Sequence, residues 1–125
     1  MLLIIAALLI TITSLAHSYL GERYLIGPII ARGDLPRLSR KRPDAAALTL
    51  RFAWHITSIA WLGIAAYAVG LTMTSVDPKK LFFGIMAITF GIHTLLPLII
   101  GRGWHKSWVP FLGITVAFGW LALTG

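Results

Sequence analysis

Histidine is the side chain in this sequence best suited to chemistry, and four histidines fall near the ends of four different hydrophobic segments. They are His17, His55, His93 and His105. If each segment is a helix that rises about 1.5 Å per residue, all four lie within roughly 12 Å of one membrane face. Because polar side chains avoid lipid, we expect His17, His55 and His93 to converge inside the molecule.

Three kinds of chemistry fit these histidines. The simplest is hydrogen bonding between helices or with water at the interface. The second is ligation of a haem iron or a transition metal, since neutral imidazole is the commonest metal ligand. The third is proton transfer inside the membrane. No HxxxH, HxxHH or ExxH spacing occurs, so the sequence leaves all three open. The candidate cofactor ligands are His17, His55 and His93, and the wider set of candidate metal ligands is His17, Glu22, His55, His93 and His105.

The stretch from His17 to Tyr24, which reads HSYLGERY, is the densest polar motif in the chain. We therefore expect any functional site to include it. Two roles are open to Arg51 in the next hydrophobic segment. It either forms an ion pair with Glu22 or extends its long side chain to lipid phosphate.

The composition indicates what must position these residues. The chain has 125 residues, of which 58% are hydrophobic and 12% are charged, whereas soluble domains carry about a quarter charged residues. Lipid must therefore solvate much of the surface, and there is room for one compact helical domain. The chain has no cysteine, which excludes disulfides, thiolate catalysis and Cys-ligated metals.

Four hydrophobic runs have the length of membrane-spanning helices, at about 1–20, 47–71, 80–100 and 104–123. Lipid cannot satisfy an exposed backbone, so runs near the roughly 20 residues that cross a bilayer must be helical. The sequence predicts an all-α fold, an integral membrane antiparallel four-helix bundle that forms a single domain over 1–125. We expect Asp44 and Asp77 to start the second and third helices. The first run lacks the basic stretch of a signal peptide, so we expect a retained helix.

Lys and Arg are divided unevenly between the two ends of these helices. Nine of the eleven flank the first and third connections, whereas Lys79 and Lys80 lie at the opposite face. The positive-inside rule then places connections 21–46 and 101–103 in the cytoplasm and both termini outside, as in a bacterial inner membrane. Because the net charge of +7 flanks hydrophobic segments, it favours lipid over nucleic acid as a partner. The residues expected to contact anionic headgroups are Arg37, Arg40, Lys41 and Arg42.

Small multidrug transporters resemble the chain in length and number of spans, but they depend on an acidic residue buried in the first helix, and none precedes Glu22 here. The function that the sequence favours is a non-catalytic subunit or interaction protein of a membrane complex, with other membrane subunits or a second copy as its partners. The alternative is a haem- or metal-binding redox protein that uses the histidines, and a small transporter is third. The sequence leaves open whether the protein is an enzyme.

Overall fold

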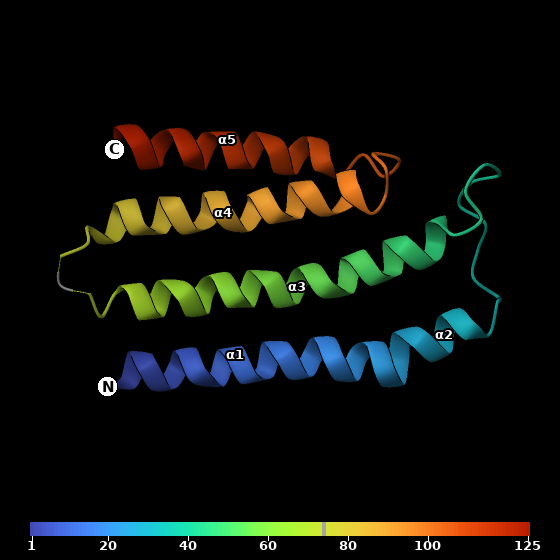
Figure 1. Cartoon of the computed structure of the whole chain (residues 1–125), viewed down its shortest axis with the longest axis horizontal. Helices are drawn as coiled ribbons and strands as arrows, with labels where there is room; N and C mark the ends of the chain where they lie inside the picture. The colour runs from blue at the N-terminus through green and yellow to red at the C-terminus, as the bar shows by residue number, and fades with distance from the viewer. Residues whose placement is uncertain (74) are drawn as a thin grey trace.

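The computed structural model describes residues 1–73 and 75–125, and within these ranges every regular element is helical. Four helices lie side by side in chain order, and both termini lie at the same end of the molecule (Figure 1). They are α1 (Leu2–Gly21), α3 (Ala45–Gly70), α4 (Pro78–Ile99) and α5 (Trp108–Thr124). The π-helical turn η1 (Glu22–Ile26) and the short helix α2 (Gly27–Ala31) continue α1. The all-α prediction is confirmed.

Three helical stretches are long and apolar enough to cross a membrane, which is compatible with a membrane protein. They are Leu2–Ala31, Ala45–Gly70 and Pro78–Ile99. α5 is also apolar but has only 17 residues, close to the lower limit for a span. It starts four residues later than the predicted run because a turn occupies the intervening residues.

The first helix extends further than the sequence predicts. It was expected to end near residue 20, but it continues through η1 and α2 to Ala31, so the non-helical connection is shorter. The wide turn makes this possible, because the Gly27 N–H bonds to Glu22 O, five residues back. A Cβ on Gly27 would lie 2.8 Å from that oxygen, so the turn requires glycine there. Pro28 then falls in the first turn of α2, where a proline sacrifices little hydrogen bonding.

The two predicted helix starts have different outcomes. Asp77 caps α4 as expected, since its carboxylate accepts from the backbone N–H groups of Lys79 at 2.8 Å and Lys80 at 2.9 Å. Asp44 is the N-cap residue of α3, as predicted, but its side chain makes no cap bond to the helix. It pairs with Arg42 at 3.1 Å, which takes the carboxylate away from the helix N-terminus.

The close helix contacts run between helices that follow one another in the chain: α1 with α3, α3 with α4, and α4 with α5. Small residues allow the close approach. Gly63 of α3 lies under Thr89 of α4, and a Cβ there would be 2.5 Å from the Thr89 hydroxyl oxygen. Ala7 of α1 and Ala65 of α3 are buried in the same way between their helices. Such small contacts are what packing between membrane helices requires.

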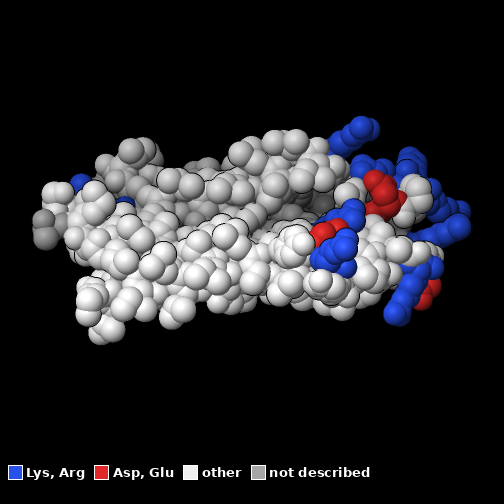
Figure 2. All heavy atoms as spheres, turned by 60° about the horizontal axis from the view of Figure 1, so that its bottom comes forward, with Lys and Arg blue, Asp and Glu red and all other residues white. Residues whose placement is uncertain are grey.

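Most charged side chains gather at one end of the molecule, a few basic atoms lie at the other end, and the space-filling view shows a broad uncharged middle (Figure 2). This basic end consists of α2, the connection 32–44 and the turn 100–107. A smaller group of basic and acidic atoms lies on the same face, set back from that end. The molecule is therefore polarised along the helix axes.

Candidate functional site

A cluster of polar side chains lies between the first helical stretch and α3, and we call it the polar cluster. Its members are His17, Ser18, Glu22, Arg51, His55 and Ser58. Ser18 and Glu22 are four positions apart, and Arg51, His55 and Ser58 follow one another at four and three positions, a spacing that places side chains on the same helix face. Three members of the cluster, His17, Ser18 and Glu22, belong to the HSYLGERY stretch that the sequence singled out.

A chain of hydrogen bonds connects the two histidines of the cluster. His55 Nδ1 lies 2.8 Å from Ser18 Oγ, and the Ser18 hydroxyl donates to Ser58 Oγ at 3.0 Å. Ser58 Oγ in turn lies 3.0 Å from His17 Nδ1. Because the single Ser18 proton goes to Ser58, the Nδ1–H of His55 must donate to Ser18. The Ser58 proton is then available to His17, so all the donors can point in one direction.

An ion pair completes the cluster on the side of the basic end. Arg51 Nη2 lies 2.7 Å from Glu22 Oε1, so of the two roles that the sequence left open for Arg51 the structure has the ion pair. The second carboxylate oxygen of Glu22 lies 3.4 Å from His55 Nε2. The three side chains are only partly covered, with exposed fractions of 46% for Arg51, 35% for Glu22 and 34% for His55. The charged part of the cluster therefore lies on the surface of the protein.

Gly21 and Trp54 hold the two helices together beside the cluster. A Cβ on Gly21 would overlap the Trp54 indole, so only glycine allows the ring to lie there. The indole N–H donates to His17 O at 3.0 Å, and the His17 ring stacks on Trp54 at 4.3 Å with an interplanar angle of 2°. The π-helical turn η1 begins at the next residue, Glu22. Turns of this kind are frequent at functional sites, where they redirect a side chain.

The structure does not bring His93 to the polar cluster. His93 is buried and faces a different interface, where its Nε2 lies 3.2 Å from Ile56 O of α3. Its ring packs between Phe90 and Phe111, with ring centroids 5.5 and 5.4 Å away. Its Nδ1 has no hydrogen-bond partner in the described part of the chain.

His105 lies in the turn between α4 and α5, where its Nδ1 is 2.8 Å from Ser107 Oγ. The structure therefore brings together His17, Glu22 and His55 of the five candidate metal ligands, and leaves His93 and His105 elsewhere. Among residues 1–73 and 75–125, no three His, Cys, Asp or Glu side chains form a group that could hold a metal ion.

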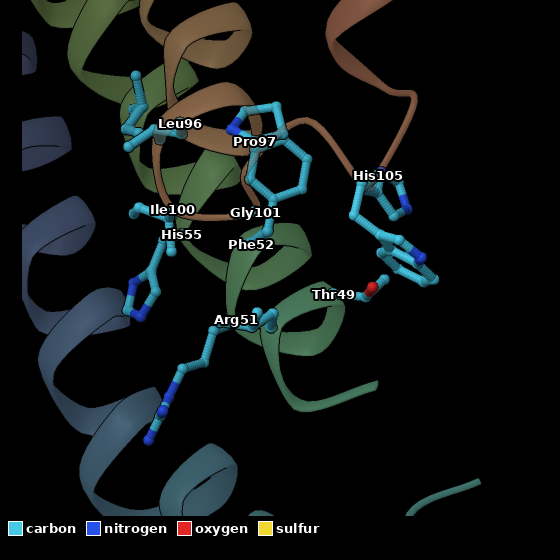
Figure 3. A pocket seen from close by; sticks show the side chains of 12 residues that line it. Thr49, Arg51, Phe52, His55, Leu96, Pro97, Ile100, Gly101 and His105 are labelled. Carbon is cyan, nitrogen blue, oxygen red and sulfur yellow. The ribbon is translucent and has the colours of Figure 1, made fainter. Parts of the chain in front are cut away.

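A cavity of about 330 Å³ lies between α3 and α4 at the basic end (Figure 3). Its walls are mainly apolar, formed by Leu48, Phe52, Ile59, Leu96, Pro97 and Ile100. Thr49 and His105 add polar atoms. Arg51 and His55 also line it, but their polar ends extend toward the ribbon of the first helix, where Glu22 binds them. The sequence did not predict this cavity.

The four residues expected at lipid headgroups do not behave alike. Arg37, Arg40 and Lys41 are exposed. Arg42 is partly buried, because it pairs with Asp44 and also donates to Gly101 O at 3.3 Å. The guanidinium lowers the pKa of the Asp44 carboxyl. Arg42 therefore fastens the connection 32–44 to the end of α4. Contact of these four basic residues with lipid headgroups stays a prediction.

Sequence reasoning singled out Ser18 within the HSYLGERY stretch but missed Ser58, which joins Ser18 to His17. The available signal was spacing, since Ser58 lies three positions after His55 and four after Trp54. No comparable spacing marks the residues that line the cavity. No protein family model, no curated protein and no solved structure matches the chain, so the candidate site rests on the geometry described above.

Proposed function

We propose that the chain is an integral membrane protein whose four helices cross the bilayer as an antiparallel bundle, with the basic end in the cytoplasm and both termini outside. The concentration of Lys and Arg at the end opposite the termini supports this orientation (Figures 1 and 2). We propose a bacterial inner membrane as the location, with which this orientation is compatible.

Reporter fusions test the orientation. A fusion at Pro36, in the exposed part of the connection 32–44, is expected to report the cytoplasm, and a fusion after Gly125 is expected to report the outside. The opposite pair of results would contradict the proposal. Release of the protein from membranes by alkaline carbonate, without detergent, would contradict membrane insertion itself.

Within the membrane, we infer that the protein is a non-catalytic subunit that docks against another membrane protein through the seam between α1 and α3. The observation that carries this inference is the partly exposed trio of Glu22, Arg51 and His55. Arg51 is six residues past the start of α3, or about 9 Å along the helix. If the membrane begins where α3 begins, the trio lies within it, and charged groups there normally face protein or a watery cavity because contact with lipid is costly. A polar face on a neighbouring helix would cover the trio.

The absence of cysteine makes this docking testable by single-cysteine crosslinking. Tyr19 lies one turn from Glu22 and is 67% exposed, while Ile88 of α4 is equally exposed but far from the seam. In native membranes, Tyr19→Cys is expected to give a discrete crosslinked species and Ile88→Cys is not. A species of twice the chain mass would identify a second copy, and another mass would identify a different subunit. Equal crosslinking at the two positions would contradict docking at the seam.

Proton transfer is a second candidate function, favoured by the aligned donors of the polar cluster. A proton accepted by His55 on the Glu22 side can leave through Nδ1 and move to Ser18, Ser58 and His17 in sequence. Protein reconstituted in liposomes should then dissipate a pH gradient faster than empty liposomes do. Ser58→Ala should abolish the difference, while His105→Phe, outside the chain of hydrogen bonds, should retain it. If liposomes that contain the protein dissipate the pH gradient no faster than empty liposomes do, proton transfer is contradicted.

Haem or metal binding by the histidines stays a prediction, but in the described residues His93 lies at another interface and does not form one group with His17 and His55. An absorbance spectrum that contains a Soret band, or stoichiometric metal in the purified protein, would support it. His55→Ala should then lose the band or the metal.

A further inference from the structure

We propose that the cavity between α3 and α4 binds an anionic phospholipid, with one acyl chain inside the cavity and the phosphate against the cations at its mouth. The proposal rests on the membrane location proposed above, and it adds a specific ligand site to it. It also differs from diffuse contact between the basic connection and headgroups, because it assigns one cavity and one class of occupant.

The shape of the cavity favours an extended apolar chain. On α3 its lining runs from Leu48 to Ile59, which is about 16 Å along the helix axis. Its volume of about 330 Å³ is at the lower end of the range for small-molecule sites. The slot lies parallel to the helices, as acyl chains do in a bilayer. The lining contains no carboxylate, so nothing in it would repel an anion at the mouth.

The mouth of the cavity is basic. Arg102 follows the lining residue Gly101, and it is exposed and holds an unusual positive φ of 49°. Arg42 donates to Gly101 O at the same edge, but its guanidinium is already paired with the Asp44 carboxylate, so its charge is neutralised there. Lys106 is exposed beside His105, another lining residue. Guanidinium groups bind phosphate oxygens with two parallel hydrogen bonds, which suits a phosphodiester headgroup.

A second hollow in the molecule provides an internal comparison. It has a volume of about 270 Å³, lies between α1 and α3, and is lined by Leu9, Ile10, Thr13, Trp61 and Ile64. No charged residue lines it. An acyl chain would find apolar contacts in either hollow, but only the cavity at the basic end offers cations to a phosphate. Selection of anionic lipid is therefore expected at the cavity alone.

Native mass spectrometry of the full chain, incubated with equimolar phosphatidylglycerol and phosphatidylcholine, tests the proposal. The wild type should retain one phosphatidylglycerol in preference to phosphatidylcholine. Leu96→Trp should abolish retention by filling the cavity. Ile100→Phe fills it from the exposed edge and should also abolish retention, which covers the case in which the first variant does not fold. Ile10→Trp, in the second hollow, should behave as the wild type.

Two further measurements separate the contribution of the basic side chains from that of the lipid acyl chain. Arg102→Gln should lower the preference for phosphatidylglycerol about fivefold, since one cation near a headgroup contributes roughly a factor of this size. Glycerol phosphate and inorganic phosphate should fail to displace the lipid, because the acyl chain supplies part of the binding.

Three results would overturn the proposal: equal retention of the two lipids, retention by both cavity-filling variants, or displacement by free phosphate. A protein that stays in detergent without lipid preference would overturn this inference alone. A protein that is soluble without detergent would overturn the membrane proposal as well.

Discussion

Ser58 contacts three residues of α1 from a single position on α3. Its carbonyl oxygen accepts from the Ser14 hydroxyl at 2.8 Å, and its own hydroxyl oxygen lies 3.0 Å from both Ser18 Oγ and His17 Nδ1. Its side chain is buried in the interface. The hydroxyl therefore links the two histidines of the polar cluster and also fastens one helix to the other.

Replacing Ser58 by Ala should reduce the free energy of unfolding by about 1 kcal/mol, since two hydrogen bonds are lost and each contributes about 0.6 kcal/mol between membrane helices. Unfolding by SDS in mixed micelles measures the change. Thr57→Ala is the matched control, because the hydroxyl of the half-buried Thr57 donates to Ala53 O of its own helix and not to another helix. Equal effects of the two substitutions would show that the linkage contributes nothing.

Gly21 should be the glycine least tolerant of a methyl group. Gly21→Ala is expected to lower the free energy of unfolding by about 1–3 kcal/mol, because the new Cβ displaces the Trp54 indole from its contact. Gly113→Ala in α5 meets no atom within 4 Å and should stabilise the helix by about 0.5–1 kcal/mol. Trp54 fluorescence, in a variant in which the other tryptophans are Phe, would report the displacement. If Gly21→Ala changes neither the free energy of unfolding nor the Trp54 fluorescence, the close contact is contradicted.

The helices were predictable because long apolar runs in lipid have no alternative to helix, and the Asp77-Pro78 start of α4 follows from local chemistry. The continuation of α1 was not predictable, since Pro28 normally indicates a break and only the wide turn η1 accommodates it. The position of His93 was missed for another reason. α3 faces two neighbours, and helical spacing does not tell which neighbour each face meets. His55 and Ser58 meet α1, whereas Ile56 meets α4.

The cap of α4 should depend on pH. The backbone N–H of Lys80, and then that of Lys79, lower the pKa of the Asp77 carboxyl. Because the folded pKa lies below the unfolded one, the cap stabilises α4 above about pH 4 and is lost as the pH falls through the folded pKa. Asp77→Asn keeps an acceptor that does not titrate. The thermal midpoint of the wild type should therefore fall relative to that of the variant on acidification. A difference between the two midpoints that does not change with pH would contradict the cap.

On the scale of the whole molecule, the charges of the connection 32–44 should control orientation. Replacing Arg37, Arg40 and Lys41 together by Gln removes exposed charge from the basic end without breaking a recorded contact. A fraction of the molecules should then insert with the termini inside, as measured by labelling of a cysteine placed at Gly125 with an impermeant reagent. Replacing Lys79 and Lys80 by Gln is the control and should leave the orientation unchanged. Labelling that is the same in all three proteins would show that other features set the orientation.

The packing of each helix on its neighbour in the chain also has a consequence for the order of assembly. Contacts between nearby segments can form as soon as both have been synthesised, and domains commonly begin to fold from the N-terminal side during translation. Every residue of the polar cluster precedes residue 59. The first two long helices can therefore complete the cluster on the ribosome, before α4 has emerged to form the cavity beside it.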